Sequence, residues 1–185
     1  MFKEALLEPL LRKYRKNRVL SHIPDNCVLC DVGCGFNGDF LRSISSKISL
    51  GIGIDKKVTP YHDNKIKLLR DDIEKSLSLK SEMFDSVTML AVLEHLDHPY
   101  SILKECYRIL KPAGILILTT PTPLSKPLLE FLSFRLRIVS REEIADHKHY
   151  FSGREIRKIL EEIGFKTIIT KTFQFKLNNF VVAYK

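Results

Sequence analysis

Residues 28–38 constrain the fold of this chain more than any other segment. An apolar run leads to Asp31, and three glycines follow in the pattern G-x-G-x-x-G, at Gly33, Gly35 and Gly38. This order predicts a buried strand that enters a tight turn, where residues without a side chain let a ligand approach the backbone. The helix expected after the turn presents unpaired N–H groups, which favour an anion. We therefore expect a ligand site at the carboxyl end of this first strand.

A second apolar run, at residues 50–55, also ends in an acid. Its last residue, Asp55, lies about 20 residues beyond the turn, where nucleoside-binding folds place the carboxylate that accepts both ribose hydroxyls. Asp31 stands two residues before the first glycine, and a carboxylate there would repel the phosphates of a dinucleotide. The two acids together predict a nucleoside ligand that also carries an ammonium group.

With these features the chain resembles the class I (Rossmann-like, seven-stranded) S-adenosylmethionine-dependent methyltransferases, type 11 group. The resemblance spans roughly residues 28–121 and includes Asp72, Ala-Val-Leu-Glu-His-Leu at 91–96 and Leu-Lys-Pro-Ala-Gly at 110–114. It implies a methyltransferase whose cofactor is S-adenosyl-L-methionine. It also implies an α/β fold: a doubly wound, mostly parallel seven-stranded sheet with a C-terminal antiparallel strand and helices on both faces, in three αβα layers.

The resemblance assigns residues to the cofactor. The family places an acid after the third strand on the adenine amino group and a neighbouring backbone N–H, here that of Ile73, on a ring nitrogen. Asp72 is the first choice for the acid and Asp71 the alternative, and either can also cap a helix. Gly33 and Gly35 are expected to leave room for the cofactor itself. The predicted cofactor-binding set is Asp31, Gly33, Cys34, Gly35, Gly38, Asp55, Lys56, Asp72, Ile73, Ala91 and Glu94.

Three histidines are candidates for the acid–base chemistry. The family places residues 91–96 beside the activated methyl group, and this stretch contains His95. His147 and His149 flank Lys148 in an expected loop before a helix that begins near Ser152. A histidine can take a proton from an acceptor hydroxyl because its reference pKa lies near ~6.5. The alternatives are a structural or cofactor-adjacent role for His95 and a surface or capping role for the other two.

Other sequence features narrow the acceptor. The chain lacks the N/D-P-P-Y/F signature of amino-group methyltransferases that act on DNA bases or glutamine, and Thr-Pro-Thr-Pro at 120–123 is not that motif. It also lacks a Pro-Cys nucleophile for carbon 5 of cytosine. Residues 124–139 are apolar on nearly every side and need a cover, which could be the core, a substrate tunnel, a partner subunit or a membrane surface.

These features favour a small-molecule acceptor, lipid-like or lipid-linked, methylated on oxygen or nitrogen, with peripheral membrane contact through 124–139. The alternatives are an RNA methyltransferase and a non-catalytic cofactor-binding partner subunit. The net charge of +8 comes from residues 1–18 and 164–185, which contribute +4 each. A basic patch where these two ends meet would favour an anionic partner, nucleic acid or phospholipid, and the alternative is that the ends are only solvated. Nucleic acid remains the less favoured partner. We expect one domain over residues 1–185, with an N-terminal helical segment at 1–24 and an inserted apolar lid at 124–150, as a cytoplasmic monomer or homodimer.

The cysteines do not predict a metal site. Cys27, Cys30 and Cys34 lie close together in the sequence. Cys27 and Cys30, however, are separated by an odd number of positions and therefore point to opposite faces of the first strand. Reduced, buried thiols are the expected state, and no bound metal is predicted.

Overall fold

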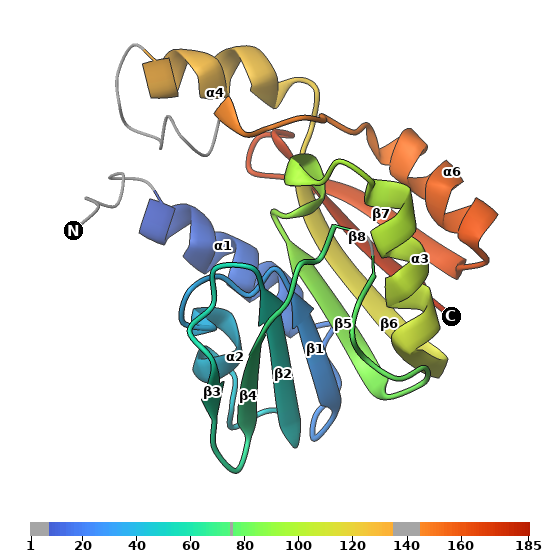
Figure 1. The fold of residues 1–185 in the computed structure, drawn as a ribbon. Helices are drawn as coiled ribbons and strands as arrows, with labels where there is room; N and C mark the ends of the chain where they lie inside the picture. Colours follow the sequence, from blue (N-terminus) through green and yellow to red (C-terminus); the bar gives the residue numbers. More distant parts are fainter. Residues whose placement is uncertain (1–7, 75, 135–144) are drawn as a thin grey trace.

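The computed structural model describes residues 8–74, 76–134 and 145–185 of the chain. Within this part, eight strands form one sheet in the order β3-β4-β2-β1-β5-β6-β8-β7 (Figure 1). The strands are β1 (Val28–Val32), β2 (Leu50–Asp55), β3 (Tyr61–His62), β4 (Ile66–Arg70), β5 (Phe84–Leu90), β6 (Leu110–Pro121), β7 (Lys166–Phe173) and β8 (Asn178–Tyr184). The helices are α1 (Glu8–Leu20), α2 (Asp39–Ser43), α3 (Pro99–Ile109), α4 (Ser125–Phe134) and α6 (Gly153–Ile163), with a 3₁₀ turn, η1 (Leu93–His95).

The predicted fold is confirmed. β1 pairs in parallel with β2 and β5, β2 with β4 and β5 with β6, whereas β8 runs antiparallel to both β6 and β7. The structure adds one strand to the seven expected, because β3 pairs antiparallel with β4 at the sheet edge. The turn between them forms because the Asp63 carboxylate accepts the backbone N–H groups of Lys65 and Ile66, at 2.8 and 2.6 Å.

Helices cover the sheet on both faces, with a separate apolar core on each. One core joins Val19 and Ile23, from α1 and just after it, and Leu41 of α2, to strand residues such as Leu29. The other joins α3 and α6 to the alternate residues of the same strands, such as Cys30. Successive strand residues point to opposite faces, so each central strand supplies both cores. This is the predicted three-layer arrangement.

Local sequence signals set the helix limits. Pro99 begins α3, where a missing N–H costs nothing. Ser152 and Glu155 form a reciprocal capping box at the start of α6, and Gly164 ends that helix at φ 114°. A second predicted capping box, at 140–143, falls outside the described residues.

The four cysteines are free and buried. Cys27 belongs to the core beneath α1 and α2, and Cys30 to the core beneath α3 and α6. The prediction that these two residues face opposite sides of the sheet is therefore confirmed. Burial raises the pKa of Cys106 to about 12, so this thiol stays protonated at neutral pH.

The apolar segment predicted at 124–139 is described as far as residue 134. Its helix α4 extends from the end of β6, beyond the faces of the sheet (Figure 1). Leu124 is 69% exposed and Leu128 is 39% exposed, so the core of the described part of the chain does not cover these two side chains. Across the described ranges, no helix combines the length and the apolarity that a membrane crossing needs.

Candidate active site

The glycine turn lies where three parallel strands end side by side. The strand register places Val32 opposite Ile54 and Asp31 opposite Thr88. The Ile54 carbonyl accepts the N–H groups of both Gly33 and Cys34, at 2.8 and 3.1 Å. These two bonds hold the turn against the end of β2, so the turn and Asp55 form one structural unit.

The glycines of the turn have different roles. Gly33 and Gly35 both adopt a positive φ, 79° and 71°. A Cβ on Gly35 would meet nothing within 4 Å, so open space adjoins the backbone there, as a closely bound cofactor requires. A Cβ on Gly33, however, would lie 2.3 Å from Val92 Cγ2, and one on Gly38 would lie 2.6 Å from Leu68 Cδ2. At Gly33, the space for a side chain is therefore taken by the loop that precedes η1. That Gly33 also leaves room for the cofactor stays a prediction.

Asp31 is a buried carboxyl at the end of β1. Its side chain is 3% exposed, and the Thr88 hydroxyl donates to its Oδ1 at 2.7 Å. Burial raises the pKa of Asp31 to about 7, against the opposing effect of the Thr88 hydrogen bond. A cation placed beside Asp31 would stabilise its ionised form, which fits the ammonium group predicted for the ligand. Thr88 escaped the sequence prediction, although a polar residue inside an apolar strand was a signal for it.

Asp55 is held in a fixed orientation at the end of β2. Its Oδ2 accepts the Gly35 N–H at 3.0 Å, and its Oδ1 accepts the Lys57 N–H at 2.7 Å. A carboxylate oxygen can accept more than one hydrogen bond, so each oxygen of Asp55 can still accept one from a ribose hydroxyl. Lys56, also predicted for the cofactor, is exposed beside it. Cys34 is buried under the turn, and desolvation raises its pKa strongly.

The two acids after β4 differ in their bonds. The carboxylate of Asp71 accepts the N–H groups of Asp72 and Ser78, at 2.9 and 3.1 Å, and so closes its own loop. Asp72 is exposed. Within the described residues, its carboxylate accepts a hydrogen bond only at Oδ1, from the Glu74 N–H at 3.2 Å. Ile73 is buried in the core, so only its backbone can serve a ligand. The structure therefore favours Asp72 over Asp71 for the adenine.

The segment after β5 carries strain and a buried acid. Ala91 has φ 57°, which is uncommon for a residue other than glycine, and its N–H donates to the Thr119 carbonyl at 2.9 Å. Glu94 is 1% exposed, and burial raises its pKa. Among the described residues, Glu94 Oε2 has no hydrogen-bond partner. A buried polar atom left in this way points to a missing ligand.

A distant loop packs on this segment. The backbone carbonyl of Glu94 accepts the N–H groups of Lys148 and His149, at 2.8 and 3.2 Å. This pairing brings His147 to His95, with ring centroids 4.8 Å apart and nearly perpendicular planes. Burial and the neighbouring His95 lower the pKa of His147 to about 4, so it is neutral at pH 7. Of the three predicted histidines, the structure brings two together.

Partners of these rings extend the cluster. His95 Nδ1 lies 3.1 Å from Asp146 Oδ2, and His147 Nδ1 lies 3.1 Å from the Tyr150 hydroxyl. The His149 ring instead lies beside Phe151, 5.5 Å away by centroid. Sequence reasoning missed Asp146 and Tyr150, and their closeness in sequence to His147 was the signal available. We refer to Glu94, His95 and His147 as the acceptor-side cluster.

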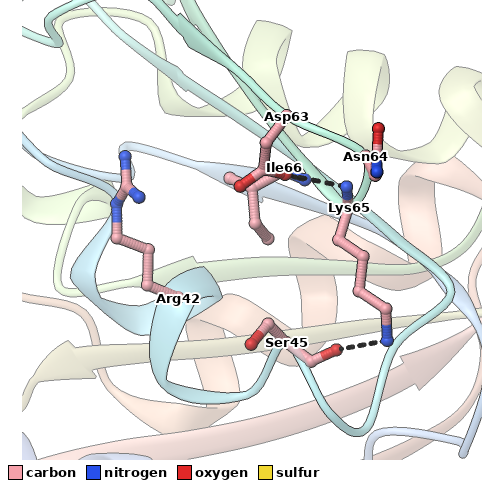
Figure 2. A pocket seen from close by; sticks show the side chains of 6 residues that line it. All are labelled: Arg42, Ser45, Asp63, Asn64, Lys65 and Ile66. Carbon is pink, nitrogen blue, oxygen red and sulfur yellow. Dashed lines mark hydrogen bonds between the residues drawn. The ribbon is translucent and has the colours of Figure 1, made fainter.

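A surface hollow lies at the amino ends of the strands, at the other end of the sheet from the glycine turn. Figure 2 shows its lining, which consists of Arg42, Ser45, Asp63, Asn64, Lys65 and Ile66. The Lys65 carbonyl accepts the Gly51 N–H at 2.8 Å, which places the hollow at the starts of β2 and β4. Ligands of doubly wound sheets bind at the carboxyl ends of the strands, where the glycine turn lies. The hollow is therefore separate from the candidate site.

Comparison with known proteins identifies the family of this chain. Residues 5–170 match the family model for a methyltransferase domain. The ubiquinone biosynthesis O-methyltransferase, mitochondrial, of Mus musculus is 29% identical, with 84% of this chain and 47% of that protein covered. Its counterpart in Rattus norvegicus is 31% identical, with coverage of 74% and 43%. The chain thus spans about half the length of these curated relatives.

Solved structures show the same fold. A SAM-dependent methyltransferase from Archaeoglobus fulgidus superposes with a TM-score of 0.69 at 20% identity, with 94% of each chain covered. A methyltransferase solved with the Trm112 activator of Haloferax volcanii gives a TM-score of 0.71 at 16% identity, with coverage of 97% and 93%. The family confirms the predicted enzyme class and its cofactor, S-adenosylmethionine. The chain belongs to the class I S-adenosylmethionine-dependent methyltransferases.

Proposed function

We propose that this chain transfers the methyl group of S-adenosylmethionine to an oxygen atom of a small-molecule acceptor. The observation that carries the proposal is the acceptor-side cluster next to the cofactor turn. Gly33 and Val92 are in contact across that boundary, because a Cβ on Gly33 would overlap Val92. The names of the mouse and rat relatives, both O-methyltransferases, support oxygen as the methylated atom.

The bound cofactor supplies an electrophilic methyl group on a sulfonium, so no covalent enzyme intermediate is needed. The residues of the chain bind, orient and handle the proton. Asp31 would hold the ammonium group, Asp55 the ribose hydroxyls and Asp72 the adenine. The acceptor-side cluster would hold the acceptor hydroxyl in line with the methyl group, where positioning supplies much of the rate. The two imidazoles offer lone pairs to the hydroxyl proton.

The exposed leucines near the same edge of the sheet support an apolar acceptor. Leu124 and Leu128 belong to the segment that follows β6, and Thr122 ties that segment to the β7–β8 turn through a 2.9 Å bond from its N–H to the Leu177 carbonyl. The basic N- and C-terminal segments support an RNA acceptor less well, because some of their cationic side chains contact other residues of the chain. Arg18 lies over the Phe180 ring, and Lys185 pairs with Glu82 at 3.5 Å.

The test is a transfer assay with cofactor labelled on its methyl carbon and a cell extract as the source of acceptors. We expect label in the lipid or small-molecule fraction, with an Asp55→Ala variant inactive. Lys158→Ala is the control, because Lys158 is exposed on α6 and belongs to neither the cofactor-binding residues nor the acceptor-side cluster. Label in RNA would contradict the acceptor class. Cofactor binding without transfer to any fraction would contradict the activity.

A further inference from the structure

The acceptor-side cluster has the composition of a metal site. One donor atom from each of Glu94, His95 and His147 lies within 4.8 Å of the other two. Glu94 lies at the buried end, and His95 and His147 are partly exposed. Glu94 Oε2 is buried and lacks a hydrogen-bond partner among the described residues. A cation would satisfy this oxygen, because the charges of His95 and Arg15 and the Thr120 hydroxyl offset the burial of Glu94 only in part.

The atoms around the two rings are arranged as they are in histidine metal sites. A histidine ligand almost always uses its second ring nitrogen to bond a carboxylate, a carbonyl or another polar group. His95 Nδ1 lies 3.1 Å from Asp146 Oδ2 and 3.3 Å from the Asp146 carbonyl. His147 Nδ1 lies 3.1 Å from the Tyr150 hydroxyl. Both rings are thereby oriented, and each offers one ring nitrogen to the group of three donors.

The backbone fixes the cluster across the fold. Glu94 and His95 belong to η1, which follows the carboxyl end of β5. His147 reaches them because the Glu94 carbonyl accepts the N–H groups of Lys148 and His149. Lys148 also pairs with Asp97 at 2.7 Å, which holds the loop to the other end of η1. Such double anchoring lets three donors from two segments remain close without a bound ion.

We propose that Glu94, His95 and His147 bind a divalent transition-metal cation of the Zn²⁺ class next to the cofactor turn. Two imidazoles and one carboxylate suit Zn²⁺, Co²⁺, Ni²⁺, Fe²⁺ or Mn²⁺, whereas Mg²⁺ prefers oxygen ligands and keeps its waters. Three protein ligands leave coordination positions open. Binding of an acceptor oxygen at these positions rests on the proposed function, whereas binding of the cation does not. With the cation bound, the imidazoles would be its ligands, and they would offer lone pairs to the hydroxyl proton only in the cation-free chain.

The charges around the cluster limit its affinity. The positive charge of Arg15 acts on Glu94 and lowers its pKa, against the larger effect of burial. The Arg15 charge repels a metal cation bound at the cluster, whereas the Asp146 carboxylate beside His95 attracts it. With three protein ligands, we expect weaker Zn²⁺ binding than at closed structural zinc sites, which have four.

The experiment measures cation binding by the tag-free, chelator-treated chain. Zn²⁺ is titrated against a chromophoric chelator, and Co²⁺ is followed by its visible absorption. We expect one cation per chain, with Mg²⁺ a poor competitor. His147→Ala and Glu94→Gln should each lower Zn²⁺ affinity about 100-fold or more, and Asp146→Asn about tenfold, as for loss of an orienting partner. His62→Ala is the matched control, because His62 is exposed on β3.

Far-UV circular dichroism and thermal unfolding, which do not depend on the cofactor, show that each variant is folded. Equal Zn²⁺ affinity in His147→Ala and His62→Ala overturns the proposal, and so does an original chain that cannot compete with the chelator. Failure of the proposed function looks different: Zn²⁺ binds as expected, but no acceptor fraction receives the methyl group.

Discussion

The cofactor side and the acceptor side of the site are built in different ways. The cofactor side consists of a turn and two strand ends between Asp31 and Asp55, and backbone N–H groups hold it together. The acceptor side joins Glu94 and His95 to His147, about fifty positions away, through side chains and two backbone bonds. The first can be specified by one local motif, whereas the second exists only after the chain has folded.

The largest expected effect is a difference in stability between variants of two glycines in the same turn. Gly33→Val places atoms within 2.3 Å of Val92 at a φ of 79°, so overpacking and strain should lower the free energy of unfolding by about 3 kcal/mol and abolish cofactor binding. Gly35→Ala meets open space, so strain alone should cost about 1–2 kcal/mol. Chemical denaturation measures both. Equal losses would show that the Val92 contact is unimportant.

Asp31 should make the cofactor side pH-dependent. Its pKa of about 7 means that the carboxyl is largely protonated below that pH, and the cofactor ammonium favours the ionised form. Cofactor affinity should therefore rise with pH through 7, by about tenfold per pH unit below the pKa. Calorimetry from pH 5.5 to 8 tests this. Asp31→Asn should bind weakly with a flat profile, and a profile that matches the original chain's would refute the assignment.

The raised pKa of Asp31 also affects the stability of the cofactor-free chain, which should fall as the pH rises, whereas cofactor affinity should rise. The carboxyl ionises at about 3.8 when unfolded and at about 7 when folded, so folding favours the protonated form. The stabilising contribution is complete below pH 3.8 and is lost as the pH rises through 7. The free energy of unfolding should therefore differ less between pH 5 and pH 8 in Asp31→Asn than in the original chain, as measured by chemical denaturation. An equal change in both would place the titration elsewhere.

The two acids after β4 offer a finer separation. Asp72→Ala should weaken cofactor binding about tenfold, as for one charge-assisted hydrogen bond, with little change in stability. Asp71→Ala should instead lower the free energy of unfolding by about 1–3 kcal/mol, because two N–H groups lose their acceptor. Calorimetry and denaturation of both variants test the assignment. The reverse pattern would make Asp71 the adenine ligand.

The smallest effect concerns the support of the acceptor side. Ser152 caps α6 directly after the loop that carries His147, and its hydroxyl accepts the Glu155 N–H at 3.3 Å. Ser152→Ala should cost about 1 kcal/mol of stability and leave cofactor affinity unchanged. Thermal unfolding with and without cofactor checks this. A weaker cofactor affinity would show that the two sides are coupled.

Much of the cofactor side could be predicted because it follows chain order. The acid, the glycine turn and the acid after the next strand each lie at a strand end, and parallel pairing places those ends together. The role of Gly33 could not be predicted, because Val92 reaches it from the loop between β5 and η1, which comes later in the chain. Thr88 is a similar case, since its bond to Asp31 depends on the β1–β5 register.

The acceptor side shows where sequence reasoning ends. Each histidine could be named as a candidate from its type and its loop. Their grouping depends on how residues 145–151 pack against η1, which no spacing in the sequence encodes. Glu94 was assigned to the cofactor from the family pattern, and its unpartnered oxygen beside two imidazoles became visible only in the fold.

Calorimetric titration of S-adenosylmethionine into Asp55→Ala and His147→Ala, followed by a transfer assay on both, tests the division of the site most directly. Asp55→Ala should lose most of its cofactor affinity. His147→Ala should bind the cofactor as the original chain does, and yet transfer little or no methyl group. Undiminished affinity in Asp55→Ala, or a loss in His147→Ala as large as that in Asp55→Ala, would contradict the account.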